Sequence, residues 1–182
     1  MRTTRLTAAF AVALGAAACA DQPTATLPVF DADMSFVANG KNAAVPLSGA
    51  EEVPARDTRA RGSATFKLSA DGQSMSYRLN VANIENVVQA HIHIAAAGAN
   101  GPFIVFLYPL SDPAGRVNGV LASGTFTAAD FVNLLAGEPM ETLVEAMRTG
   151  NAYVNVHTND GVDPANTGPG DFPGGEIRGQ IR

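Results

Sequence analysis

Apolar residues occupy every second position in two neighbouring segments of the chain, 64–68 and 75–81. A period of two places those residues on one face of a β-strand. The dipeptide Asp71-Gly72 lies between the segments, and Asp-Gly is typical of a tight hairpin turn. We therefore predict an antiparallel hairpin with one buried face.

Shorter strand-like segments recur along the rest of the chain. We expect strands at 87–94, 103–107, within 117–126, at 151–158 and at 176–182. One helical excursion is expected near 127–148. Thr127 and Asp130 have the spacing of a capping box that opens a short helix through Leu135, and a second amphipathic turn follows Pro139 and ends at Gly150. Many strands with one helical excursion predict an all-β fold, a Greek-key β-sandwich or barrel.

The N-terminal segment has the pattern of an export signal. Two arginines precede thirteen small and apolar residues, which are too few to span a bilayer. We interpret residues 1–18 as a signal peptide, 19–44 as an anchor and tether, and 45–182 as the folded domain. Cys19 follows the signal and resembles the lipidated cysteine of a bacterial lipoprotein. Plain cleavage, which would release a secreted protein, is the alternative.

Composition narrows the function classes. The 182 residues suit one domain, and the single cysteine excludes an internal disulfide framework. A formal net charge of −5 argues against nucleic-acid binding, which needs clustered positive charge. No other segment approaches the length of a membrane span, so we expect membrane attachment through the lipid anchor alone. The expected location is the periplasm or cell surface, beside an unknown protein or envelope partner.

The three histidines carry the strongest chemical signal. His91 and His93 are two residues apart in an expected strand, so both imidazoles share a face, with Cβ atoms about 6 to 7 Å apart. His157 lies on the polar face of the 151–158 strand. Neutral imidazoles suit copper or zinc, which makes His91, His93 and His157 a candidate metal site.

Other polar residues are expected to share that face. Tyr153 and Asn155 alternate with valines, and Glu176 and Arg178 alternate with isoleucine in the last strand. We expect these four side chains to surround the histidines. The alternative is a purely structural network in which the histidines hydrogen-bond Tyr153, Asn155 or Glu176.

Two acidic segments are weaker signals. Asn159, Asp160, Asp163 and Asp171 lack the spacing of an EF-hand loop, which favours a solvated acidic loop over a calcium site. The pair Glu51-Glu52 precedes Pro54 and indicates a turn at a strand end rather than a carboxylate pair.

Several motifs in order resemble the CHRD domain, which is named for its repeats in chordin. They are LSGAEEVP at 47–54, AHIH at 90–93 with Gly-Pro at 101–102, NAYVNVHT at 151–158 and GGEIRG at 174–179. A more distant likeness to Cu/Zn superoxide dismutase matches His91, His93 and His157 to three copper ligands. This sequence lacks the bridging histidine, the zinc loop and the disulfide of that enzyme. The likenesses imply an immunoglobulin-like or superoxide-dismutase-like fold.

Two functions follow as hypotheses. The first is an exported, lipid-anchored CHRD domain that acts as a binding or structural module without catalysis and without a cofactor. The second is a copper- or zinc-binding protein that binds the ion through the three histidines. Such a protein could also have dismutase-like activity. Stoichiometric metal uptake separates the two.

Overall fold

The computed structural model describes residues 43–181, and these residues form eight β-strands. The strands are β1 (Ala43–Ser48), β2 (Arg61–Leu68), β3 (Ser74–Ile84), β4 (Val87–Ile94), β5 (Phe103–Tyr108), β6 (Val117–Thr127), β7 (Ala152–Thr158) and β8 (Ile177–Ile181). The all-β prediction is confirmed. β1 begins two residues before the predicted domain start. Cys19, the signal peptide and nearly all of the tether lie outside the described residues.

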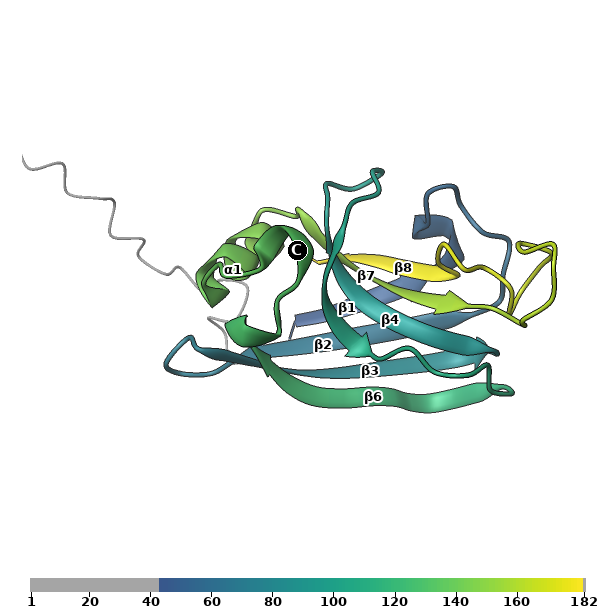
Figure 1. Ribbon diagram of the computed structural model, residues 1–182, viewed down its shortest axis with the longest axis horizontal. Helices are drawn as coiled ribbons and strands as arrows, with labels where there is room; N and C mark the ends of the chain where they lie inside the picture. The colour runs from purple at the N-terminus through teal and green to yellow at the C-terminus, as the bar shows by residue number, and fades with distance from the viewer. Residues whose placement is uncertain (1–42, 182) are drawn as a thin grey trace, which may run out of the picture. The chain divides into compact units, whose positions relative to one another are not determined.

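The strands form a single antiparallel sheet in the order β5-β4-β7-β8-β1-β2-β3-β6 (Figure 1). The order departs from chain order because the chain passes from β3 to β4 and from β6 to β7 across the sheet. The two end strands, β5 and β6, approach each other. The Tyr77 hydroxyl on β3 donates a hydrogen bond of 2.7 Å to the Leu107 carbonyl on β5. The sheet is therefore a nearly closed sandwich or barrel.

The predicted hairpin is confirmed as β2 and β3. Phe66 pairs with Tyr77 and Leu68 pairs with Met75, so the apolar positions of both strands share one face. Gly72 has a φ of +71° in the turn, a left-handed conformation that glycine adopts without a Cβ clash.

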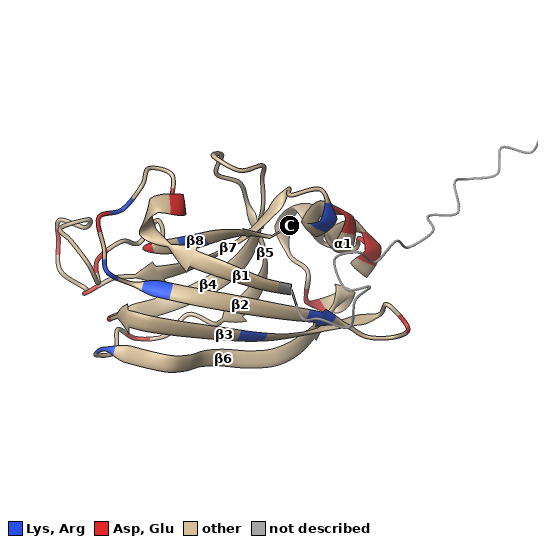
Figure 2. Cartoon of the chain, turned by 180° about the vertical axis from the view of Figure 1, so that it is seen from behind, with Lys and Arg blue, Asp and Glu red and all other residues tan. Residues whose placement is uncertain are grey.

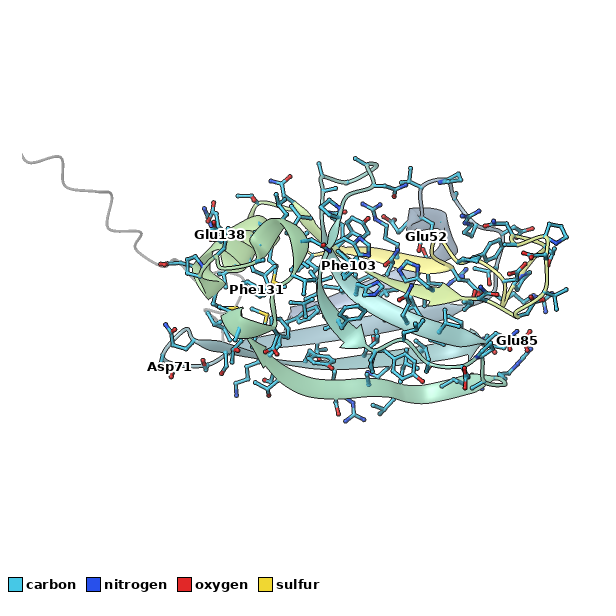
Figure 3. The ribbon with its side chains drawn as sticks, viewed as in Figure 1. Glu52, Asp71, Glu85, Phe103, Phe131 and Glu138 are labelled. Atoms are coloured by element: carbon cyan, nitrogen blue, oxygen red, sulfur yellow. The ribbon has the colours of Figure 1, made fainter. Side chains whose placement is uncertain are left out.

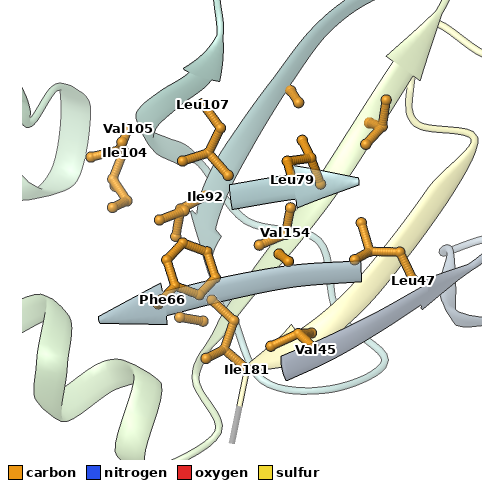
Figure 4. Packing of buried hydrophobic residues seen from close by; sticks show 14 of the residues in the cluster. Val45, Leu47, Phe66, Leu79, Ile92, Ile104, Val105, Leu107, Val154 and Ile181 are labelled. Atoms are coloured by element: carbon orange, nitrogen blue, oxygen red, sulfur yellow. The ribbon is translucent and has the colours of Figure 1, made fainter. Parts of the chain in front are cut away.

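The apolar faces of the strands enclose one hydrophobic core (Figure 4). Residues from both halves of the sheet meet there with essentially no exposed surface, among them Phe66, Leu79, Ile92, Ile104, Val154 and Ile181. At about 25 cal/mol per Å² of buried apolar surface, this burial is the main favourable term for the fold. β4 and β7, which carry the histidines, each place one face in this core.

The helical excursion is only partly as predicted. The Thr127–Asp130 capping box is present, but it opens the 3₁₀ turn η2 (Ala128–Asp130). The expected helix through Leu135 does not form. Instead, Asn133 has a φ of +53° and begins a second 3₁₀ turn, η3 (Asn133–Leu135), while the Val132 amide donates to the Ile104 carbonyl. Burial of Phe131 and Leu135 accompanies this interruption.

The second helical segment is confirmed as α1 (Met140–Arg148), which follows Pro139. Met140, Leu143 and Met147 face the core at helical spacing. Gly150 lies just past the helix end with a φ of +71°. Within residues 43–181, no helix is long and apolar enough to cross a membrane.

Candidate metal centre

Strand pairing brings the three histidines together on the face of β4 and β7 that points away from the core. His91 lies opposite Asn155, and His93 lies opposite Tyr153. His157 lies opposite Gln89. It is two residues from Asn155, so it shares the face that carries His91 and His93. Figure 2 shows that neither strand carries a formal charge, whereas acidic residues lie on α1 and in the loops. The predicted histidine cluster is therefore assembled by two adjacent uncharged strands.

The three rings converge closely enough to share one ion. One ligand nitrogen from each ring lies within 4.8 Å of the other two, and all three residues are buried. The shortest separation is 3.1 Å, between His91 Nδ1 and His157 Nε2. Two nitrogens at this separation that each lie about 2.0 to 2.1 Å from an ion subtend an angle of about 100°. That angle is closer to the tetrahedral value than to the trigonal planar one, so a planar arrangement would require the two rings to move slightly apart.

Two backbone carbonyls set the tautomers of the cluster. His93 Nδ1 lies 2.9 Å from the Gly101 carbonyl oxygen, and His157 Nδ1 lies 2.8 Å from the Pro173 carbonyl oxygen. A carbonyl oxygen only accepts, so in both rings Nδ1 carries the proton and donates it. The lone pair is then on Nε2, which is the arrangement found in metal-binding histidines whose second nitrogen is held by the protein.

Aromatic side chains shield His91 from solvent. The Phe103 ring stacks on the imidazole with a centroid separation of 4.6 Å, and the Phe106 ring meets it edge-on at 4.7 Å. Both rings come from β5, the strand next to β4, and Figure 3 shows Phe103 beside the β4 strand. Their packing leaves the Nε2 atoms of His91 and His93 buried without a hydrogen-bond partner in the described chain.

Burial keeps the histidines neutral. Desolvation, followed by the neighbouring His157 and His93, lowers the pKa of His91 to about 3. Desolvation likewise lowers the pKa of His93 to about 4, and it also lowers the pKa of His157. At neutral pH the three rings are therefore uncharged in the metal-free protein.

Tyr153 and Arg178 lie beside the cluster, stacked in the order His93, Tyr153, Arg178. The Tyr153 ring stacks on His93 at a centroid separation of 4.7 Å and an interplanar angle of 14°. The Arg178 guanidinium carbon lies 3.4 Å from the centroid of the same phenol ring. The Tyr153 hydroxyl accepts a hydrogen bond of 3.2 Å from the Gly101 amide, the residue whose carbonyl orients His93.

Glu176 faces away from the imidazoles. One carboxylate oxygen accepts a hydrogen bond of 2.6 Å from the Thr58 hydroxyl. The other accepts from the Thr158 hydroxyl at 2.8 Å and from the Gly170 amide at 2.9 Å. These bonds join β7 to two separate loops. Glu176 also lines a surface cleft with Arg59, Arg116 and other loop residues.

A buried carboxyl group near the cluster, Glu52, had not been expected. The turn η1 (Gly49–Glu51) at the end of β1 agrees with the interpretation of Glu51-Glu52 as a turn, yet it buries Glu52 and exposes Glu51. Oε1 of Glu52 and Oδ1 of Asn155 are both buried without a hydrogen-bond partner in the described chain. The Asn155 side chain acts to lower the pKa of Glu52 and to raise the pKa of His93. Only the tertiary structure reveals Glu52, because the sequence does not distinguish it from its neighbour.

The acidic loop after β7 is less solvated than predicted, because Asp171 is buried. Its Oδ2 accepts hydrogen bonds of 2.9 Å from both the amide and the hydroxyl of Thr167. These bonds, together with backbone donors of Asn166 and Asp160, lower the pKa of Asp171. Donors that converge on a carboxylate would repel a cation, so Asp171 anchors the loop.

The family model of the CHRD domain matches residues 43–181, which is the whole of the described sheet. The chain belongs to the CHRD family. No curated protein and no solved structure gave a significant match. The match confirms the resemblance found in the motifs, and its limits coincide with the first and last strands, β1 and β8.

Proposed function

We propose that this CHRD domain is an exported, non-catalytic binding module whose ligand is a single copper or zinc ion, held by His91, His93 and His157. The observation that carries the proposal is the convergence of three neutral ring nitrogens within 4.8 Å. Backbone carbonyls hold the rings of His93 and His157 through Nδ1. Nε2 of His93 has no partner in the described chain, and Nε2 of His157 contacts His91 Nδ1. Imidazole donors favour copper or zinc over calcium or magnesium.

A purely structural histidine network explains the geometry less well. Such a network satisfies its buried polar atoms, since a buried unpaired polar atom costs about 1 to 3 kcal/mol. Here Nε2 of His93, whose Nδ1 is taken by the Gly101 carbonyl, is buried and unpartnered. An ion at the centre of the cluster would bind Nε2 of His93, which has no hydrogen bond in a purely structural network.

The shielding of the site favours binding over turnover. Catalytic metal sites keep an open coordination position for substrate or water. The Phe103 and Phe106 rings cover His91, and the unpartnered nitrogens have essentially no solvent contact. The proposal therefore contains no catalytic step.

Metal uptake by the purified chain tests this function. The protein is incubated with Zn(II) or Cu(II), desalted and analysed for metal content, and the expected result is about one equivalent retained. His91→Ala and His157→Ala should abolish retention, while the exposed Gln73→Ala in the β2–β3 turn serves as a matched control. Retention of less than about a tenth of an equivalent of each ion, and of Cu(I) as well, would refute the proposal.

We further propose that the chain is exported and anchored through a lipid on Cys19, which places the metal site in the periplasm or at the cell surface. The signal-like residues 1–18 and the position of the only cysteine support this. Labelled palmitate should enter the wild-type protein and not Cys19→Ser. Label that persists in Cys19→Ser would contradict the anchor, and release of an unlabelled wild-type protein would instead indicate plain secretion.

A further inference from the structure

The histidine cluster offers three protein ligands within the described residues. No cysteine or carboxylate of 43–181 joins His91, His93 and His157 in the group. Zn(II) in proteins is almost always four-coordinate, and a site with three protein ligands completes its shell with water. Cu(I), with a filled d shell and a single charge, is stable with three neutral nitrogen donors in a plane. The ligand count therefore favours Cu(I), unless water has access.

Packed rings and burial restrict the access of a fourth ligand. Phe103 and Phe106 pack on His91, and neither ring has a lone pair to offer an ion. Tyr153 stacks on His93, but its hydroxyl is directed to the Gly101 amide. The Nε2 atoms of His91 and His93 are buried. Phe106 keeps 43% of its own surface exposed, but the two unpartnered nitrogens have almost none, so the site is closed to direct contact with bulk water.

The charge around the cluster disfavours a divalent ion. Arg178 is fully buried, and its guanidinium carbon lies 3.4 Å from the centroid of the Tyr153 ring, whose other neighbour is the His93 imidazole at 4.7 Å. Its hydrogen bonds go to Asn100, Ala96 and Gln180, all through neutral oxygens. Within residues 43–181, no carboxylate oxygen lies within ion-pair distance of this guanidinium. Repulsion scales with the charge of the bound ion, so a divalent ion meets twice the repulsion that a monovalent ion meets.

Glu52 supplies only part of the missing negative charge. Burial raises the pKa of Glu52 to about 7, although the positive charges of Arg178 and Arg56 act to lower it. Near neutral pH this carboxyl group is therefore protonated in a large fraction of molecules. Two positive charges on the ion would be poorly compensated in this setting.

From these contacts we propose that the ion is monovalent copper, held three-coordinate and dry by His91, His93 and His157, with the Arg178 guanidinium selecting against divalent ions. This inference rests on the proposed function and narrows it from copper or zinc to one ion and one oxidation state. The site then receives Cu(I) directly, and no electron transfer is required for loading.

Competition between ions tests the proposal on the full wild-type chain. Under anaerobic conditions Cu(I) is supplied as its bicinchoninate complex, and Zn(II) and Cu(II) are supplied with chromophoric chelators of known affinity. Cu(I) should bind at one equivalent and at least about a hundredfold more tightly than Zn(II). X-ray absorption at the copper edge should show three nitrogen neighbours. Tighter binding of Zn(II) or Cu(II), or a fourth ligand on Cu(I), would overturn the proposal.

The same experiment separates this inference from the proposed function. If none of the three ions is retained, the metal-binding function itself fails. If Zn(II) or Cu(II) is retained through His91 and His157 while Cu(I) binds more weakly, the function stands and the choice of Cu(I) fails.

The role of Arg178 is tested by Arg178→Gln, with the exposed Arg59→Gln as a matched control. Removing the buried charge should narrow the Cu(I) to Zn(II) affinity ratio by about tenfold, while Arg59→Gln leaves the ratio unchanged. A folded Arg178→Gln protein with the wild-type ratio would overturn the guanidinium as the selecting group. Circular dichroism shows whether Arg178→Gln is folded. If it is not, the competition experiment and the X-ray absorption spectrum of the wild-type protein still show whether the bound ion is Cu(I).

Discussion

His91 Nδ1 and His157 Nε2 lie 3.1 Å apart although the two residues are 66 positions apart in the chain. The Pro173 carbonyl holds the proton of His157 on Nδ1. The metal-free pair is therefore joined by a proton on His91 Nδ1, which donates to His157. If these two residues were to hold a metal ion, the proton would have to leave His91 Nδ1, and Nε2 of His91 could carry it, so both rings would stay neutral.

We predict that the metal-free protein loses stability as the pH falls below about 6.5. The pKa of His91 is lowered to about 3 and that of His93 to about 4, from an ordinary value of 6.5. Between these values the two histidines bind more protons in the unfolded chain than in the folded chain, and they outweigh the single opposing proton on Glu52. The free energy of unfolding therefore decreases with falling pH. Urea unfolding at pH 7, 5.5 and 4.5 measures this. His91→Ala should flatten part of the slope, and an unchanged slope would contradict the pKa assignment.

We predict that Glu52→Gln gains stability relative to wild type as the pH rises from about 4.5 to 7. Burial raises the pKa of Glu52 to about 7 from 4.5, so in this range the folded protein keeps a proton on Glu52 that the unfolded chain has lost. The contribution of Glu52 to the free energy of unfolding therefore falls as the pH rises, and the difference between Glu52→Gln and wild type at each pH isolates it from the opposite effect of the histidines. The relative gain should reach up to about 3 kcal/mol. Chemical denaturation of Glu52→Gln across this range, with the exposed neighbour Glu51→Gln as control, gives the measurement. Parallel curves for Glu52→Gln and wild type would rule out a buried ionisable carboxyl.

We predict that Glu176→Ala destabilises the domain by about 3 kcal/mol or more. The substitution leaves the Thr58 and Thr158 hydroxyls and the Gly170 amide without their acceptor, and each lost bond to a charged group costs about 1.5 to 3 kcal/mol. Glu138→Ala, at an exposed position before α1 (Figure 3), is the matched control. Thermal unfolding of both variants measures the difference, and equal midpoints would contradict a stabilising role for the hydrogen bonds of Glu176.

We predict that Gly101→Ala weakens metal binding as well as stability. A Cβ at Gly101 would overlap the backbone carbonyl of Ile94, so the loop must move and carry with it the carbonyl that orients His93. Gly115→Ala is the control, because nothing lies within 4 Å of its added Cβ. Metal retention after desalting should fall at least about tenfold in Gly101→Ala only. Retention equal to wild type would show that the Gly101 carbonyl does not position His93.

Local periodicity predicted much of this protein. The alternation in 64–68 and 75–81 predicted β2 and β3, and the spacing of His91 and His93 predicted a shared face. These features are local, because the direction of a side chain from a strand depends only on its position in a two-residue repeat. The same local reasoning failed at Leu135, where burial of apolar side chains accompanies an interruption of the expected helix.

The sequence by itself determined the strand pattern, the family motifs and the three candidate ligands. Only the tertiary structure decided that Gly101 and Pro173 turn their carbonyls to the imidazoles, that Phe103 and Phe106 cover His91, and that Glu52 rather than Glu51 is buried. These contacts join loops to strands far away in the chain. No local repeat encodes them, since they form only when the nearly closed sheet brings β4, β7 and the loops around them together.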